Sequence, residues 1–166
     1  MFAAYKSHNN NLYNNLVKLS RNIFFYKDLN LKDNFETRII LIFLHFSIVI
    51  EVFKAKKKSK FPQKIYDNVF LNIEYHLREL GYGDIAVNKK MKLLNKIFYN
   101  FLLKISDNKS SAFKINTSIL EEYFKSKDNT KANYTSKLGD YFENFYNFCF
   151  ELDGNTMIEG KINYNI

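Results

Sequence analysis

The sequence predicts an all-α fold: a single-domain bundle of five to six helices with an extended C-terminal tail. The 166 residues include only one Pro and five Gly, so few positions force a helix to end. Apolar residues recur at helical spacing along most of the chain. At this length, folding buries roughly 70% of the surface of the extended chain, so the core needs neither a disulfide nor a structural metal. The single Cys149 excludes an internal disulfide framework.

The first helix is predicted from about residue 10 to Tyr26, because apolar side chains follow a helical repeat at Leu12, Leu16, Leu19 and Ile23. The repeat breaks at 29–34, where Asp33 or Asn34 can cap a second helix. That helix contains the run 39–50, which is apolar on all sides, so the rest of the chain must surround it. Its twelve residues reach about 18 Å, against about 30 Å of bilayer hydrocarbon, which favours a buried core helix over a membrane span.

A third helix is expected to start at Pro62, since Pro fits the first helical turn. Its inward stripe is Ile65, Val69, Ile73, Leu77 and Leu80. Gly81 suits the left-handed residue that ends a helix, and the carboxylate of Asp84 can cap the next one. The fourth helix is predicted from about Asn88, with an inner face made of Met91, Leu94, Phe98, Phe101 and Ile105.

The remainder of the chain is predicted to contain two further helices, around 116–125 and 134–152, after a loop at 107–111. Residues 153–166 lack a helical pattern and are expected to form an extended or mobile tail. No repeat or linker divides the chain, so the helical domain is taken as residues 1–152.

The net charge of +8 is typical of proteins that bind nucleic acid or anionic lipid. Only three of the 25 Lys and Arg residues are Arg. Because phosphate-binding sites favour Arg, the net charge alone is weak evidence for a nucleic-acid or lipid partner. Two clusters follow the second helix and open the fourth: Lys54, Lys56, Lys57, Lys58 and Lys60, and Lys89, Lys90, Lys92 and Lys96. Each could be a solvated face or could bind RNA, the ribosome or an anionic membrane; no DNA partner is expected.

The sequence contains no Gly-rich phosphate loop, no H-E-x-x-H motif and no G-x-S-x-G motif, so we expect no enzymatic activity and no cofactor. Burial between two Phe residues is expected to raise the pKa of Cys149 and to make its thiol inert. His45 and His76 lie on neighbouring predicted helices, and two inward imidazoles could hold a b-type haem, which is the lower alternative. Otherwise His45 is a hydrogen-bonded core residue and His76 faces solvent.

Several segments, read in order, resemble one protein family. The most specific is L-R-E-L-G-Y-G-D-I-A-V at 77–87, where a helix end, a double-Gly turn and an acidic residue precede the basic restart K-K-M-K at 89–92. Shorter matches are F-Y-K-D-L at 25–29, E-T-R at 36–38, L-I-F-L-H at 41–45 and F-Y at 98–99. Over about residues 10 to 105 the chain is similar to the ubiquinol–cytochrome c chaperone family, the cytochrome b assembly factors of mitochondria and their alphaproteobacterial relatives.

The resemblance implies a non-enzymatic assembly chaperone that binds newly made cytochrome b and supports assembly of the cytochrome bc1 complex of the respiratory chain. It also implies a small partner protein and a position near the ribosome. The start of the chain has neither an apolar signal region nor an Arg-rich presequence, so we expect a cytoplasmic protein, peripheral to the inner membrane. Departures from the family pattern are Lys32-Asp33 in place of Pro-Asp and Asn100-Phe101 in place of Gly-Arg.

Partner-binding residues can be carried over only from the most specific block: Arg78, Glu79, Tyr82, Asp84, Met91 and Lys92. Tyr82 lies between two glycines and is expected to project outward as the exposed aromatic residue of this surface. The alternative is that these residues only cap and orient two helices.

Overall fold

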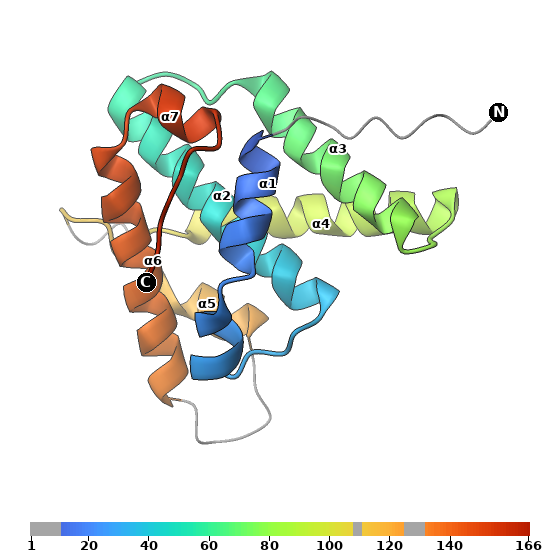
Figure 1. Ribbon diagram of the computed structural model, residues 1–166, viewed down its shortest axis with the longest axis horizontal. Helices are drawn as coiled ribbons and strands as arrows, with labels where there is room; N and C mark the ends of the chain where they lie inside the picture. The colour runs from blue at the N-terminus through green and yellow to red at the C-terminus, as the bar shows by residue number, and fades with distance from the viewer. Residues whose placement is uncertain (1–10, 108–110, 125–131) are drawn as a thin grey trace.

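The computed structural model describes residues 11–107, 111–124 and 132–166, and within them the all-α prediction is confirmed (Figure 1). These ranges contain one short π-helix and seven α-helices, where five to six helices were predicted: α1 (Asn11–Ser20), η1 (Phe24–Asp28), α2 (Phe35–Lys57), α3 (Gln63–Glu79), α4 (Asp84–Lys104), α5 (Thr117–Tyr123), α6 (Ala132–Glu151) and α7 (Gly154–Ile158). The β-type pairing among the described residues is limited to an isolated bridge between Ser106 and Ile115. The predicted loop at 107–111 lies partly outside the described residues.

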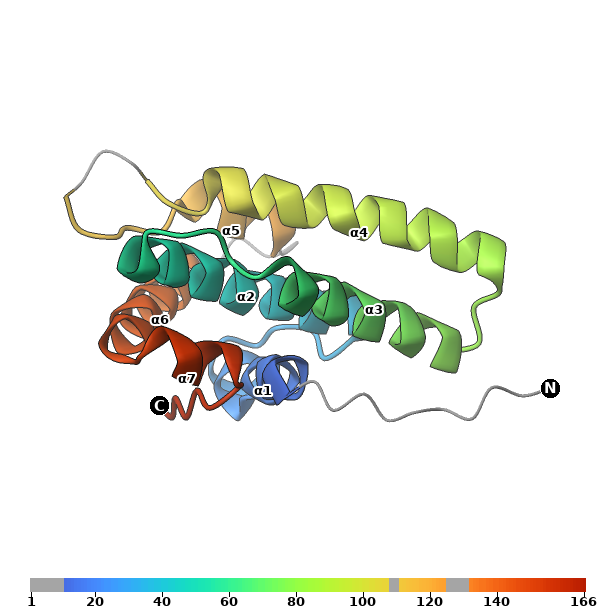
Figure 2. The same ribbon diagram turned by 90° about the horizontal axis from the view of Figure 1, so that it is seen from above.

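Helix α2 occupies the centre of the molecule. In Figure 2, α4 lies on one side of α2 and α3, and α1, α6 and α7 lie on the other. Helix α2 contacts α1, α4, α6 and α7, and every residue from 39 to 50 is buried, as the apolar run predicts. The helix begins at Asn34, whose side chain accepts a hydrogen bond from the backbone N–H of Thr37, so one of the two predicted caps is confirmed. Among the described residues, none of the helices combines the length and the apolar character needed to cross a membrane.

Aromatic side chains fill the space between α2 and the helices around it. Between α2, α3 and α4, the ring of Phe98 lies 5.1 Å from that of Phe43 and 5.2 Å from those of Phe46 and Phe70. These centroid distances are those of favourable stacked and edge-to-face pairs. The inner face predicted for α4 is therefore confirmed at Phe98, Phe101 and Ile105, which are all buried.

The predicted first helix is interrupted. Helix α1 ends at Ser20, whose hydroxyl donates to the carbonyl of Val17, and the π-helix η1 begins at Phe24. The carbonyl of Ser20 then accepts a hydrogen bond from the Tyr26 hydroxyl at 2.7 Å. The break changes the helical phase, so Ile23, predicted on the buried stripe, is 59% exposed. Leu12, Leu16 and Leu19 are buried as predicted.

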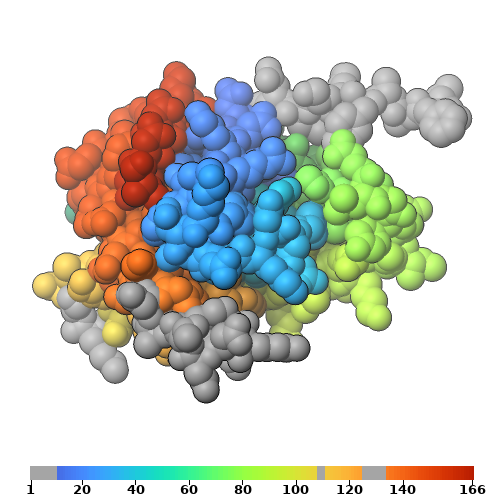
Figure 3. Space-filling model, turned by 60° about the horizontal axis from the view of Figure 1, so that its bottom comes forward, coloured from blue at the N-terminus to red at the C-terminus, as the bar shows by residue number. Residues whose placement is uncertain are grey.

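The C-terminal segment differs from the extended or mobile tail that the sequence predicts. Asp153 caps α7, and both Met157 and Ile162 are buried. The Asn15 side chain exchanges two hydrogen bonds with the backbone of Ile162, at 3.0 and 3.2 Å. Figure 3 shows these last residues lying beside α1 and α6 on the surface of the bundle. Long-range contacts with α1, which no local pattern reveals, therefore hold this segment in place.

The docking of this segment predicts that Gly160→Ala destabilises the fold. Gly160 has a φ of +71°, and an added Cβ would lie 2.3 Å from the carbonyl carbon and oxygen of Asn11. We expect the free energy of unfolding in urea to fall by about 2 kcal/mol or more. The matched control is Gly139→Ala inside α6, whose new Cβ would make only an ordinary 3.5 Å contact with Ile115. Wild-type stability in the Gly160 variant would contradict the docking.

Candidate functional site

The turn between α3 and α4 is the centre of the block that carries the family resemblance. Gly81 adopts a φ of +92°, so the predicted left-handed residue is confirmed. The N–H of Gly81 donates to the carbonyl of Arg78 at 3.0 Å, and that of Tyr82 donates to Leu77 at 3.3 Å. These bonds satisfy carbonyls at the end of α3. Leu80, predicted on the inward stripe, is 52% exposed because α3 has already ended.

Arg78 joins the two helices across this turn. Its guanidinium donates one hydrogen bond to the Asp84 carboxylate and another, of 3.0 Å, to Glu74 on the preceding turn of α3. These hydrogen bonds, to Asp84 first and Glu74 second, raise the pKa of Arg78. The prediction that Asp84 caps α4 is wrong, because Gly83 is the N-cap and the Asp84 side chain makes no capping bond. Helix α4 also begins at Asp84, four residues before the predicted start at Asn88.

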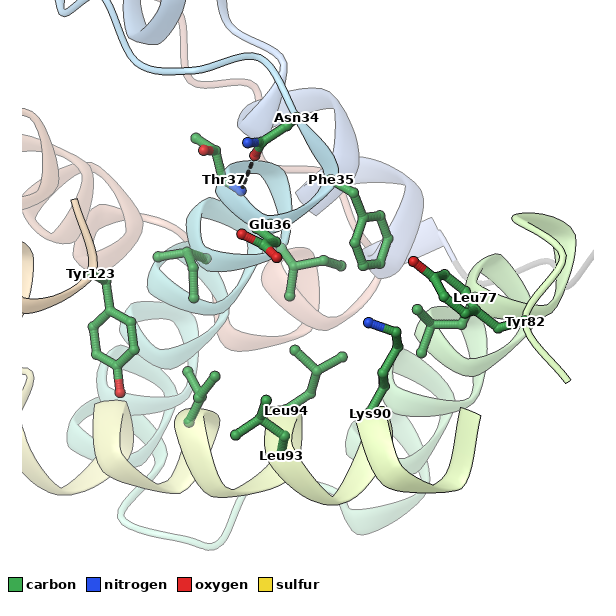
Figure 4. Close-up of a pocket in the computed structure, with 13 residues that line it drawn as sticks. Asn34, Phe35, Glu36, Thr37, Leu77, Tyr82, Lys90, Leu93, Leu94 and Tyr123 are labelled. Carbon is green, nitrogen blue, oxygen red and sulfur yellow. Dashed lines mark hydrogen bonds between the residues drawn. The ribbon is translucent and has the colours of Figure 1, made fainter. Parts of the chain in front are cut away.

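A groove of about 540 Å³ opens beside this turn (Figure 4). Its walls come from the first turns of α2, the end of α3, the middle of α4 and the end of α5. The apolar lining is Phe35, Ile39, Ile40, Leu77, Leu93, Leu94 and Ile97. The polar lining is Asn34, Glu36, Thr37, Tyr82, Lys90 and Tyr123. An open groove with a mostly apolar lining and a few polar groups at its edge is suited to binding a ligand or a peptide.

The rim of the groove carries an aromatic residue and a charge. The ammonium of Lys90 lies 4.6 Å from the ring centroid of Tyr82, which is a cation–π contact. Tyr82 is 40% exposed, in agreement with its expected outward position. Figure 4 shows Lys90 reaching into the groove from α4 and Glu36 from α2, on the opposite wall. Both signs of charge are therefore present at the opening.

The residues proposed as partner contacts have different surroundings. Tyr82 lies at the groove, while Arg78 and Asp84 bind each other across the turn. Met91 is half-buried against the core, and Glu79 and Lys92 are exposed. The sequence did not predict the apolar walls of the groove. The one local signal was Leu93, an apolar residue that lies outside the predicted inner face of α4.

The Lys cluster at the end of α2 is largely engaged within the protein. The ammonium of Lys56 donates to the carbonyls of Phe150, at 2.5 Å, and Leu152 at the end of α6. Lys57 forms an ion pair with Asp153 at 3.6 Å, and Lys54 one with Glu51 at 3.7 Å. Lys58, in the left-handed conformation, ends the helix, and Lys60 is exposed. Three of the five lysines thus help to hold the C-terminal segment or their own helix.

The groove and the turn lie within the part of the chain that matches a known family. A family model described as "Ubiquinol-cytochrome C chaperone" matches residues 27–163. The chain belongs to the ubiquinol-cytochrome C chaperone family. The match starts later than the resemblance suggested and extends to α5, α6 and α7, so the C-terminal segment is part of the family unit.

A solved structure shares the fold of this chaperone-family chain. The crystal structure of the Cbp3 homolog from Brucella abortus superimposes with a TM-score of 0.70 and 23% sequence identity. The match covers 94% of this chain and 87% of the other. None of the curated proteins compared with the chain matches it.

The geometry of His45 does not fit the haem alternative. Its Nδ1 lies 2.7 Å from the carbonyl of Leu41, which can only accept, so Nδ1 carries the proton. Its Nε2 therefore accepts a hydrogen bond from the Tyr141 hydroxyl at 2.8 Å. Both ring nitrogens are occupied, and neither is free to bind iron. The ring of His76 instead packs 5.4 Å from that of Phe35, on another side of α2.

The cysteine of this family member is also closed to solvent. Cys149 is fully buried, and burial raises the pKa of its thiol to about 12, as expected for an inert cysteine. In the described ranges, no three His, Cys, Asp or Glu side chains are arranged to hold a metal ion.

The buried imidazole predicts a pH dependence of stability. Burial lowers the pKa of His45 from 6.5 to about 4, so between these values the unfolded chain binds a proton that the folded chain excludes. The contribution of His45 to the free energy of unfolding is therefore full above about pH 6.5. It decreases by about 3 kcal/mol as the pH drops towards 4. Urea unfolding of His45→Leu should show a lower stability at neutral pH but a flatter decline than the wild type. Equal declines in the two proteins would refute this role for His45.

Proposed function

We propose that this chain is a non-enzymatic assembly chaperone that binds newly made cytochrome b and supports assembly of the cytochrome bc1 complex. The family assignment supports a role in assembly of ubiquinol–cytochrome c oxidoreductase. The observation that carries the binding step is the open apolar groove between α2 and α4. A membrane subunit exposes apolar segments before it inserts, and such a groove can cover part of one.

The residues at the groove give this binding step a physical basis. Leu93 is 58% exposed and Tyr82 is 40% exposed, so a bound segment would remove apolar and aromatic surface from water. Ile39 and Ile40 form a floor that is already buried, at 3% and 8% exposure. The floor therefore stays covered without a client, and the surface that a client would newly bury belongs to the rim.

Under this proposal the protein works in the cytoplasm, where it would meet cytochrome b at the inner membrane. A small partner protein and a position near the ribosome belong to the same proposal, as implied by the family resemblance. The alternative function is a basic helical module that binds RNA, the ribosome or a membrane surface. For RNA and the ribosome it depends on lysines alone and makes no use of the apolar groove.

Leu93→Asp should reduce the capture of cytochrome b. Burying an aliphatic side chain contributes about 1.5 to 3 kcal/mol, so a charge at this position should lower client recovery by roughly tenfold or more. The measurement is crosslinking of the tagged protein in its native cells, followed by affinity capture in mild detergent and quantification of cytochrome b against other membrane proteins. Tyr82→Ala should give a smaller loss.

Ile23→Asp is the matched control, because Ile23 is 59% exposed and lies outside the groove. This variant should capture cytochrome b as the wild type does, and all variants should melt at similar temperatures. Undiminished capture by Leu93→Asp would refute the groove as the client site. Recovery of ribosomal RNA without cytochrome b from wild-type cells would refute the chaperone proposal itself.

A further inference from the structure

The outer face of α4 has a composition that the core does not explain. Six residues fall on one line of the helix, opposite the buried Phe98 and Ile105: Ile85, Lys89, Lys92, Lys96, Tyr99 and Leu103. We call this line the α4 stripe. Ile85 is 87% exposed and Leu103 is 81% exposed, which are the largest exposed fractions of any large apolar side chain described. The stripe spans about 27 Å at 1.5 Å per residue.

The lysines of the α4 stripe differ from those at the end of α2. In the described part of the chain, Lys89, Lys92 and Lys96 form no ion pair, whereas Lys54, Lys56 and Lys57 have internal partners. Asp84 is the single acidic residue of α4, and Arg78 binds its carboxylate. The stripe therefore presents a positive charge that no carboxylate of α4 is free to balance.

We propose that the α4 stripe docks on the surface of an anionic phospholipid bilayer. Figure 2 shows α4 as the outermost helix on its side of the molecule, where it can lie flat against a plane. Lysine ammonium groups meet lipid phosphates at the interface, while Ile85, Tyr99 and Leu103 enter the boundary between headgroups and acyl chains. Charge complementarity and exposed apolar side chains on one helical face are the two requirements of such docking.

RNA fits the same face less well. Its phosphates would bind the lysines, but they offer nothing to the aliphatic side chains of Ile85 and Leu103. Sites for single-stranded RNA use several aromatic rings and Arg side chains, and the stripe has one Tyr and no Arg. The bilayer is therefore the occupant that explains both kinds of side chain.

Docking in this orientation brings the groove close to the bilayer, because Lys90, Leu93 and Ile97 on the adjacent side of α4 line the groove. Lipid binding depends only on the stripe and requires no client. It can therefore be tested, and can fail, independently of cytochrome b capture.

The test is flotation of the purified full chain with vesicles of phosphatidylcholine and phosphatidylglycerol in a two-to-one ratio, compared with vesicles of phosphatidylcholine alone. The wild type should float with the anionic vesicles. The triple variant Lys89→Glu, Lys92→Glu and Lys96→Glu should bind them at least roughly tenfold more weakly. The double variant Ile85→Ser and Leu103→Ser should bind several-fold more weakly, and its residual binding should be more sensitive to salt.

Two matched controls distinguish binding through the α4 stripe from binding caused by net charge or by exposed apolar residues elsewhere. Lys18→Glu, Lys27→Glu and Lys32→Glu change the net charge equally at exposed positions elsewhere. Ile23→Ser and Ile166→Ser remove exposed aliphatic residues outside α4. Both controls should retain most of the binding.

Equal loss in the two triple variants would show attraction by net charge alone and would overturn the proposal. Absence of wild-type flotation would also overturn it, as would unchanged binding after Ile85→Ser and Leu103→Ser. Displacement from vesicles by polyuridylic acid, with Lys-dependent binding to that RNA, would assign the face to RNA instead. Circular dichroism melting checks that each variant is folded.

Discussion

The need to bury α2 on every side determines the rest of the structure. A helix whose residues 39–50 are all buried cannot lie at the surface, so α1, α4, α6 and α7 must contact it from different directions. Polar groups on such a helix need internal partners. His45 bonds to Leu41 and Tyr141, and the Ser47 hydroxyl donates to the carbonyl of Leu44. The surrounding helices pack one apolar face on α2, and several of them also contact one another, as α3 does with α4 and α5 with α6.

The two basic regions show how similar sequences acquire different roles from their surroundings. At the end of α2, the ammonium groups approach the last carbonyls of α6 and the acidic Asp153, so they stabilise the junction with α7. On α4 the lysines lie on a helix with a single acidic residue, already bound by Arg78. Sequence alone places charge in both regions, but only the fold distinguishes charge that is neutralised from charge that is available.

Local patterns predicted most helices because their apolar repeats face the common core. They failed where distant residues decide the conformation. The C-terminal segment is held by hydrogen bonds from Asn15 to Ile162 and by the close approach of Gly160 to Asn11. Most of the chain separates Asn11 and Asn15 from this segment. Asp84 was assigned as a cap from its position, whereas Arg78 competes for its carboxylate across the turn. The groove was not predicted, because its walls come from four helices.

The groove lies at the start of α2, between the helices that pack around it. Its floor is formed by Ile39 and Ile40 at the start of α2, which the surrounding side chains already bury. A client segment placed in the groove would lie over a floor that needs no further cover. Because the floor is nearly dry when empty, most of the surface that a client would cover belongs to Leu93 and Tyr82 at the rim. Such an interaction is limited in strength, which suits a chaperone that must release its client when assembly proceeds.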